Sequence, residues 1–310
     1  MRIIIDTDPG TDDAVAILIA LANFNDDEIL GITTVAGNVG VKVGTRNALR
    51  ILEQAGRNNI KVYEGESAPL NRELLTAEWV HGTDGLGGVP FPEPSKTEED
   101  IDAVTFLKEE ILNSEEKVTI CVLGPMTNIG KAIQEKPEIV SNIAQIVFMG
   151  GSAAGGNTTP AAEFNILVDP EATDIVLHSG AELIMMGLDV THQAISTSDR
   201  IQNISDTKTK TSELLVGLMS RLANLEIVQK KFPDGTPVHD AFVTAYLVDS
   251  SLTEGNFVNV EVETSSELTL VQTVVDINEI SGREKNVHWM NSVDDDKLFA
   301  IITKTSESLP

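Results

Sequence analysis

Short apolar runs alternate with segments of helical spacing along the first two thirds of the chain, and this alternation limits the possible folds more than any other feature. Each run has the length of a buried strand, and each intervening segment places apolar residues on one helical face. Successive parallel strands need a crossover between them, which a helix usually supplies. The pattern predicts an α/β fold with an open, mostly parallel, Rossmann-like central sheet flanked by helices. The predicted strands are Arg2–Ile5, Ile29–Val35, Val118–Leu123, Ile143–Met149 and Leu183–Leu188. The predicted helices are Ala14–Leu21, Val41–Leu52, Ile101–Leu112 and Pro170–His178.

The pattern changes toward the C-terminus. A closing helix is expected over Asp294–Thr303. The glycine- and proline-rich stretch His81–Pro94 predicts a mobile loop, and a polar helical region near Ser196–Lys231 predicts a cap over one face. Three short runs before the closing helix predict a small antiparallel meander, over Phe257–Val262, Leu268–Val275 and Asn286–Met290.

Length, charge and cysteine content exclude several classes of protein. With 310 residues, 41% of them apolar, the chain can bury one large core, and we expect a single domain over residues 1–310. The net charge of −26 repels polyanions and argues against nucleic-acid binding. No apolar run is long enough for a membrane span, and the N-terminal run is too short for a signal peptide, so the cytoplasm is the expected compartment. The lone Cys121, inside a predicted strand, is expected to be buried and inert.

Polar segments follow the predicted strands at the points where those strands end. In a parallel sheet such segments emerge together at the carboxyl edge, where open α/β sheets bind their ligands. Residues far apart in the sequence should therefore converge there. The segments are Asp6–Asp13, Gly37-Asn38, Gly124–Asn128 and Gly150-Gly151.

The first of these segments carries four aspartates, Asp6, Asp8, Asp12 and Asp13. Four carboxylates leaving water together repel one another unless a cation compensates them. Carboxylate oxygens suit Ca²⁺ or Mg²⁺, and the absence of a His/Cys cluster argues against zinc. Pro9 and Gly10 turn the chain sharply, so that Asp8 and Asp13 can approach one ion from two sides of the loop.

Three other interpretations of this segment are weaker. An EF-hand loop counted from Asp6 needs glycine where Thr11 stands and glutamate where Ile17 stands. Asp6-Thr7-Asp8 resembles the nucleophile motif of haloacid dehalogenase phosphatases, but the residues after it do not. An acidic cap of the following helix accounts for one aspartate and not for four.

Motifs along nearly the whole chain resemble those of the inosine-uridine preferring nucleoside hydrolases, and they occur in the same order. The resemblance implies the nucleoside hydrolase fold and a dimer or a tetramer. The motifs are Asp6–Ala14, Gly37-Asn38, Arg46–Ala48, His81-Gly82, Gly124–Asn128, Met149–Gly151, Ala162–Asn165, Asp169–Ala172 and Pro237–Ala241.

The resemblance implies one Ca²⁺ per subunit and a set of residues around it. Asp8 is also implied as the general base that takes a proton from the attacking water. Asp6 is expected behind the ion, where it orients the loop. The implied Ca²⁺ ligands are the side chains of Asp8, Asp13 and Asp240 and the main-chain carbonyl of Thr127. The implied sugar contacts are Asp12 and Asn38 to the 2′-hydroxyl, Asn165 to the 3′-hydroxyl, Asn157 and Glu163 to the 5′-hydroxyl, and Met149 along the pocket.

Histidines and aromatic residues are expected on the base side of the substrate. His239, beside Asp240 and expected to titrate near neutrality, is the candidate acid that protonates the leaving base; the alternative is a structural histidine that orients Asp240. His81, in the predicted mobile loop, corresponds to a family histidine that approaches the base. Further expectations are Phe232 covering the base, Trp79 packing under the loop or touching the base, His178 at a helix end on the surface, and His192 without a role.

The activity implied is Ca²⁺-dependent hydrolysis of ribonucleosides to free base and ribose, as used in purine or pyrimidine salvage. Cleavage of the C1′–N bond places positive charge on the ribosyl ring, which surrounding carboxylates stabilise. Two alternatives are a non-catalytic nucleoside-binding protein and, with less support, a metal-dependent phosphatase. Since no site motif places Lys or Arg beside the aspartates, we expect a neutral nucleoside to be preferred over its 5′-monophosphate.

Overall fold

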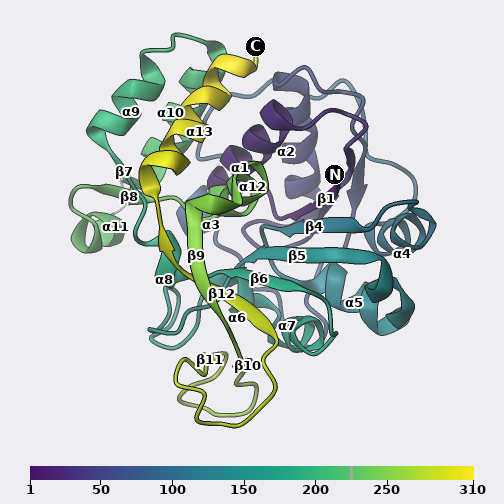
Figure 1. The fold of residues 1–310 in the computed structure, drawn as a ribbon. Coiled ribbons are helices and arrows are strands. Elements are labelled where there is room, and N and C mark those ends of the chain that lie inside the picture. The colour runs from purple at the N-terminus through teal and green to yellow at the C-terminus, as the bar shows by residue number, and fades with distance from the viewer. Residues whose placement is uncertain (224–225) are drawn as a thin grey trace.

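A computed structural model describes residues 1–223 and 226–310 of the chain. Within these residues, eight strands form the central sheet, in the order β3-β2-β1-β4-β5-β6-β12-β9 (Figure 1). Neighbouring strands are parallel from β3 to β12, and β9 is antiparallel to β12. The strands are β1 (Arg2–Thr7), β2 (Ile29–Thr34), β3 (Val62–Glu64), β4 (Val118–Val122), β5 (Ile143–Met149), β6 (Leu183–Met186), β9 (Thr253–Val258) and β12 (Val287–Val293). The predicted mostly parallel sheet and its five strands are confirmed, whereas β3 was not predicted.

Side chains alternate between the two faces of the sheet, and each face has its own core. Ile3 and Ile5 of β1 pack in one cluster, and Ile4 between them packs in the other. The cluster with Ile3 contains the apolar faces of α1 (Thr11–Asn23), α2 (Val41–Gln54), α10 (Lys210–Ala223), α12 (Ala241–Val248) and α13 (Asp295–Ser308). The cluster with Ile4 contains α4 (Ala103–Asn113), α5 (Thr127–Glu135) and α7 (Pro170–Leu177).

Short elements connect these layers. Within the central strand β4, burial raises the pKa of the Cys121 thiol to about 12, so the thiol is inert as expected. Among the described residues, no helix is both long and apolar enough to cross a membrane. The remaining helices and turns are α3 (Glu78–His81), η1 (Pro137–Asn142), α6 (Phe164–Val168), α8 (Leu188–Thr191), α9 (Ser198–Ser205), α11 (Glu226–Lys231) and η2 (Ser250–Leu252). The remaining strands are β7 (Ile195–Thr197), β8 (Gly235–Pro237), β10 (Val260–Val262) and β11 (Thr273–Val275).

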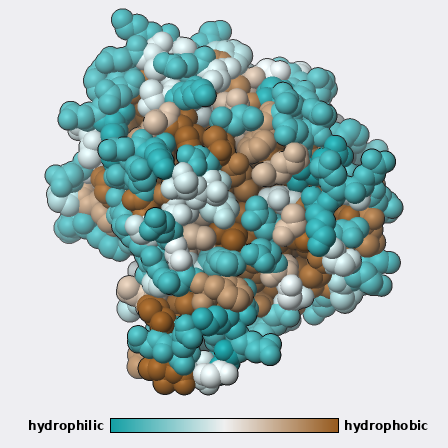
Figure 2. Space-filling view, in the orientation of Figure 1, coloured by the Kyte–Doolittle hydropathy of each residue, from teal (hydrophilic) through white to brown (hydrophobic). Residues whose placement is uncertain are grey.

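The C-terminal strands are antiparallel, as predicted, but they do not form one meander. β9 and β12 extend the central sheet, because β12 pairs in parallel with β6 through His288 and Trp289. β10 and β11 form a separate pair that projects from the body of the molecule (Figure 1). Figure 2 shows apolar side chains on this projection, whose connecting loops carry Leu268, 90% exposed, and Ile280, 82% exposed. The predicted closing helix is confirmed as α13.

The polar helical region near Ser196–Lys231 does not form a single cap. α10 packs against α1, α9 and α13, because Leu215 and Leu218 on its inner face are buried in the core. Of the described residues in and directly after this region, only those of α11 and Phe232 reach the pocket described below.

Candidate active site

The polar segments that follow the strands converge at the carboxyl edge of the sheet, as predicted. They enclose a cavity of about 350 Å³, a size typical of small-molecule sites. Three of the predicted site residues, Asp8, Asp13 and Thr127, are buried and do not line the cavity. The others all line it: Asp12, Asn38, His81, Met149, Asn157, Glu163, Asn165, His239 and Asp240.

Asp8 is buried directly after β1, with its two carboxylate oxygens in different surroundings. Oδ2 accepts a 2.6 Å hydrogen bond from the main-chain N–H of Asn38, whereas Oδ1 has no partner among the described residues. A Cβ atom added at Gly37 or Gly124 would overlap this carboxylate, so the position of Asp8 depends on both glycines. Burial, and then the charge of Asp13, raise the pKa of Asp8 well above its usual value. When ionised, the Asp8 carboxylate is therefore a buried negative charge that needs a positively charged group to compensate it.

Asp13, in the first turn of α1, is more fully hydrogen-bonded. Its Oδ1 accepts from the Thr7 hydroxyl at 2.6 Å, and its Oδ2 accepts from the Gly10 N–H at 2.9 Å and from the Asn38 amide at 3.0 Å. The bond from Gly10 is the helix-cap interaction considered from the sequence. Capping thus accounts for part of the role of Asp13 and for none of the other three aspartates.

A cluster of three carboxylates stands at the floor of the cavity. One oxygen each from Asp12, Asp13 and Asp240 lies within 4.8 Å of the others. The cluster contains Asp12 where the sequence analysis placed Asp8. Burial raises the pKa of Asp12 to about 7 and that of Asp240 well above its usual value, and the neighbouring aspartates act in the same direction.

Asp6 is fully buried near the end of β1, and its expected place behind the ion stays a prediction. Its Oδ1 accepts from the Thr33 hydroxyl at 2.5 Å and from the Asn128 amide at 2.8 Å, while Oδ2 has no partner among the described residues. Burial raises the pKa of Asp6 to about 7, against which the two hydrogen bonds act. Asn128 also donates to the main chain of β2 at Thr34, so this bond fixes α5 against the strands.

The donor set suits a hard dication. Buried carboxylate oxygens without a hydrogen-bond partner among the described residues occur on Asp6, Asp8 and Asp12, and a native protein compensates such groups with a cation or a proton. All the donors are oxygens, which Ca²⁺ and Mg²⁺ accept readily. Thr127 begins α5 beside these residues, and its hydroxyl donates to Asp169 at 2.7 Å. The carbonyl of Thr127 as a ligand stays a prediction.

The wall opposite the aspartates is polar and well ordered by hydrogen bonds. Asn165 donates both amide hydrogens to main-chain carbonyls, of Leu123 at 2.8 Å and Met149 at 3.2 Å. This leaves the amide oxygen of Asn165 to accept from a ligand hydroxyl. Glu163 accepts main-chain hydrogen bonds from Gly151, Asn165 and Ile166, and burial raises its pKa.

Asn157 is exposed at the rim of the cavity. Its side-chain oxygen accepts from the main-chain N–H of Phe164 at 3.0 Å, which leaves its amide hydrogens available for a ligand. Phe164 itself lines the cavity and was not among the predicted residues.

His81 is 6% exposed at the end of α3, next to the predicted mobile loop. Its Nδ1 accepts from the main-chain N–H of Thr11 at 3.2 Å, so the neutral ring carries its hydrogen on Nε2. Burial lowers the pKa of His81 to about 4. The loop after it turns through glycines of positive φ and is held by Leu86, which is buried in the core.

The far end of the cavity is formed by two histidines and an aromatic ring. His239 contacts the Thr191 hydroxyl through Nδ1 at 2.9 Å, and its ring centroid lies 5.7 Å from that of His192. His192 lies 5.0 Å from the ring of Phe232, which lines the cavity as expected. The sequence analysis gave His192 no role, although it follows a strand at the same carboxyl edge as the other site residues. This place in the sequence could have identified His192 as a site residue.

The expectation that His239 titrates near neutrality is wrong for the protein without ligands. Burial, together with the charges of the neighbouring His192 and Lys231, lowers the pKa of His239 to about 3, so the ring is neutral at pH 7. Lys231, which the sequence analysis did not name as a site residue, also lines the cavity beside Phe232. Trp79, 60% exposed, lines the rim.

Comparisons with known proteins agree with this fold. An uncharacterized protein of Schizosaccharomyces pombe is 42% identical over 312 residues, covering 100% of both chains. Pyrimidine-specific ribonucleoside hydrolase RihA of Shewanella sp. (strain MR-7) is 41% identical over 292 residues, 94% of this chain and 92% of the relative. Among solved structures, a purine-preferring ribonucleoside hydrolase from Gardnerella vaginalis has a TM-score of 0.89 at 31% identity, covering 99% of both chains.

The sequence profile described as inosine-uridine preferring nucleoside hydrolase matches residues 3–300. The predicted resemblance and enzyme class are thereby confirmed. The order of the motifs, the fold and these matches show that the chain belongs to the inosine-uridine preferring nucleoside hydrolase family, whose members are N-ribosyl hydrolases of the glycosidase class.

Proposed function

We propose that the protein hydrolyses the N-glycosidic bond of ribonucleosides to free base and ribose, and that this activity depends on Ca²⁺. The observation that carries the proposal is the buried, unpartnered Oδ1 of Asp8 beside the carboxylates of Asp12, Asp13 and Asp240. The family is metal-dependent, and an all-oxygen donor set around a sugar-sized cavity supports calcium as the ion. Asp8, Asp13, Asp240 and the carbonyl of Thr127 are the proposed ligands.

The ribose is proposed to lie between the aspartates and the asparagine wall. Asp12 and Asn38 take the 2′-hydroxyl, and the free amide oxygen of Asn165 accepts from the 3′-hydroxyl. Asn157 donates to the 5′-hydroxyl through its amide, while Glu163, whose oxygens already accept from the main chain, accepts from the same hydroxyl. Met149 closes the sugar pocket. This arrangement holds the anomeric carbon above the acidic floor.

Asp8 is the proposed general base. The hydrogen bond from Asn38 to Oδ2 fixes the orientation of the Asp8 carboxylate. The other oxygen, Oδ1, then accepts the proton of the attacking water. A bound Ca²⁺ supplies the positive charge that orients the ribose diol and lowers the pKa of that water. The carboxylates stabilise the oxocarbenium character that develops as the C1′–N bond breaks.

The leaving base needs a proton or hydrogen-bond donors on the opposite side. His239 is proposed as a hydrogen-bond donor to the departing base through an N–H of its neutral ring, because burial removes the imidazolium form at pH 7, and the base then takes its proton from solvent, to which Asp8 returns the proton of the attacking water. His81 supports it as a fixed Nε2–H donor, since its Nδ1 is occupied by Thr11. Phe232 covers the base from above.

The first substrate to examine is a pyrimidine ribonucleoside. The pyrimidine-specific RihA of Shewanella sp. (strain MR-7) is 41% identical to this chain, whereas the solved purine-preferring enzyme is 31% identical. The direct experiment measures ribose release from uridine, cytidine, inosine, adenosine and guanosine after removal of metal and after addition of Ca²⁺. Release restored by Ca²⁺ and lost in Asp8→Asn supports the proposal, and equal release with a chelator present contradicts its calcium requirement.

The same assays separate the alternative functions. p-Nitrophenyl riboside and p-nitrophenyl phosphate report glycosidase and phosphatase activity, and a nucleoside-binding protein without turnover acts on neither. A phosphate in the cavity would meet Asp12, Asp240 and Glu163, which disfavours the phosphatase. A role in nucleoside salvage stays a prediction from the family. A dimer or tetramer is a second such prediction, and analytical sedimentation measures the oligomeric state.

A further inference from the structure

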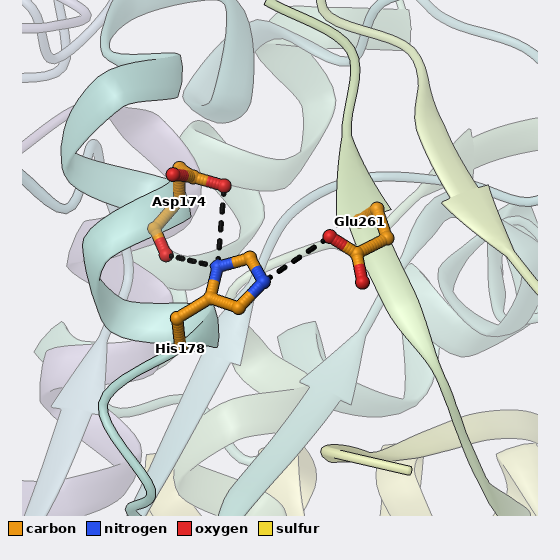
Figure 3. Close-up of side chains that lie close together, drawn as sticks. All are labelled: Asp174, His178 and Glu261. Carbon is orange, nitrogen blue, oxygen red and sulfur yellow. Dashed lines mark hydrogen bonds and ion pairs between the residues drawn. The ribbon is translucent and has the colours of Figure 1, made fainter. Parts of the chain in front are cut away.

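A second cluster of possible metal ligands lies outside the cavity, between α7 and β10. His178 follows the last turn of α7, Asp174 stands one turn earlier, and Glu261 projects from β10 (Figure 3). One possible ligand atom from each residue lies within 4.8 Å of the others. Nδ1 of His178 is 3.2 Å from Oδ1 of Asp174, and Nε2 is 3.2 Å from Oε2 of Glu261.

Hydrogen bonding fixes which nitrogen of His178 carries hydrogen. Nδ1 lies 2.9 Å from the main-chain carbonyl of Asp174, and a carbonyl can only accept, so Nδ1 is the donor. In the neutral ring Nε2 then presents a lone pair to the Glu261 carboxylate, which is also an acceptor. Two acceptors that face each other at this distance need a positive charge between them, which either a proton on Nε2 or a metal ion can supply.

This arrangement is the one that metal-binding histidines adopt. Such a histidine usually donates its other ring N–H to a main-chain carbonyl or a carboxylate, and Asp174 supplies both. Zinc bonds of about 2.0–2.1 Å in a tetrahedral shell place neighbouring ligand atoms about 3.3 Å apart. The 3.2 Å separation of His178 Nε2 and Glu261 Oε2 agrees with that spacing.

Glu261 is held in position by a buried neighbour. The side-chain amide of Asn259, which is 6% exposed, donates to Oε1 of Glu261 at 3.0 Å and to the main chain of Glu284 at 2.9 Å. Arg283 lies 3.9 Å from the same Oε1. Both contacts leave Oε2 directed at His178, so a ligand oxygen is fixed in advance.

The cluster is open to ions and water. The His178 side chain is 51% exposed and borders, with Glu261, a groove of about 410 Å³. Solvent can therefore complete the coordination shell of an ion held by His178 Nε2 and Glu261 Oε2.

We propose that His178 Nε2 and Glu261 Oε2 are the protein ligands of a second divalent-cation site, for a transition metal such as Zn²⁺, that joins α7 to β10, and that Asp174 orients the imidazole through its Nδ1–H. An imidazole nitrogen as a ligand suits Zn²⁺, Co²⁺ or Ni²⁺ better than Ca²⁺. The all-oxygen cluster of Asp12, Asp13 and Asp240 has the opposite preference, so the two sites differ in their ions. The second site fastens the β10–β11 projection to the body of the protein.

The test is zinc binding by the full-length protein in the presence of excess Ca²⁺. Metal-depleted wild type, His178→Gln and Glu261→Gln are dialysed against Zn²⁺, and the zinc retained per chain is measured. His288→Gln is the matched control, because His288 also pairs with one exposed carboxylate, Glu182 at 2.9 Å, but belongs to no three-residue cluster among the described residues.

We expect wild type and His288→Gln to retain one more zinc per chain than His178→Gln and Glu261→Gln. Zn²⁺ should also raise the melting temperature of the first two proteins and not of the last two. Should His178→Gln fail to fold, Glu261→Gln decides, since its side chain can keep the bond from Asn259. Equal zinc retention in all four proteins, or none in wild type, overturns the proposal and leaves a proton as the cation between His178 and Glu261.

Discussion

The main-chain N–H of Asn38 donates a 2.6 Å hydrogen bond to Oδ2 of Asp8. The other oxygen of Asp8, Oδ1, is buried without a partner among the described residues. One carboxylate oxygen is thus fixed by the protein, and the other is available to a cation and to water.

The Asp8→Asn variant tests this division directly. Its amide oxygen can keep the bond from Asn38, but the side chain neither accepts a proton nor carries charge. Loss of a general base lowers kcat by about 10²–10⁴-fold, and loss of a metal ligand adds to that. Steady-state rates on uridine or inosine, with circular dichroism as the check on folding, measure it. A kcat within tenfold of wild type would show that another group is the base.

Gly124 and Gly40 provide a matched pair for the position of Asp8. A Cβ at Gly124 would overlap the Asp8 carboxylate, whereas a Cβ at Gly40 would meet nothing within 4 Å. We expect Gly124→Ala to lose most of its activity and Gly40→Ala to keep the wild-type rate. Comparable rates for the two variants would mean that the Asp8 carboxylate need not stand where the structure has it.

Asp6 predicts a pH dependence of stability in the metal-free protein. Burial raises its pKa from 3.8 to about 7 in the folded state, so the folded protein binds this proton more tightly than the unfolded chain. The ionised Asp6 side chain therefore lowers the free energy of unfolding. This loss is absent below pH 3.8, grows as the pH rises from 3.8 to about 7, and remains constant at higher pH. Asp6→Asn should therefore be more stable than wild type at pH 8, with the difference shrinking toward pH 4. Denaturant unfolding at both pH values measures it, and a constant difference contradicts the raised pKa.

Neutral nucleosides are predicted to react faster than their 5′-monophosphates. Glu163 is a proposed 5′ contact, and Asp12 and Asp240 line the same cavity, so a phosphate would stand among like charges, which costs several kcal/mol. We expect kcat/KM for uridine to exceed that for UMP by at least about 100-fold, since each 1.4 kcal/mol corresponds to tenfold. Equal values would place the phosphate elsewhere, with Lys231 as the first residue to examine.

The sequence was sufficient to predict five strands of the central sheet and nine of the residues that line the cavity, because both depend on local patterns. Buried parallel strands such as β1 are apolar throughout, and polar residues after such strands meet at one edge of the sheet. The pairing of β12 with β6 joins segments about a hundred residues apart and has no local signal. β3 has three residues, too few for a periodic pattern.

Other features of the site depend on burial and on the exact path of the backbone. Asp8 and Asp12 are equivalent as sequence letters, and only the turn into α1 places Asp12 in the cluster with Asp13 and Asp240. The lowered pKa of His239 follows from its burial beside His192, a contact between segments that are distant in the sequence. Neither feature follows from composition or periodicity.

The most direct measurement is a crystal structure of the protein soaked with Ca²⁺ and a slowly cleaved ribonucleoside analogue. The account predicts one ion that contacts Asp8, Asp13 and Asp240 together and also contacts both hydroxyls of the ribose. An ion bound without Asp8, or a ribose whose 2′- and 3′-hydroxyls do not reach the ion, would contradict it.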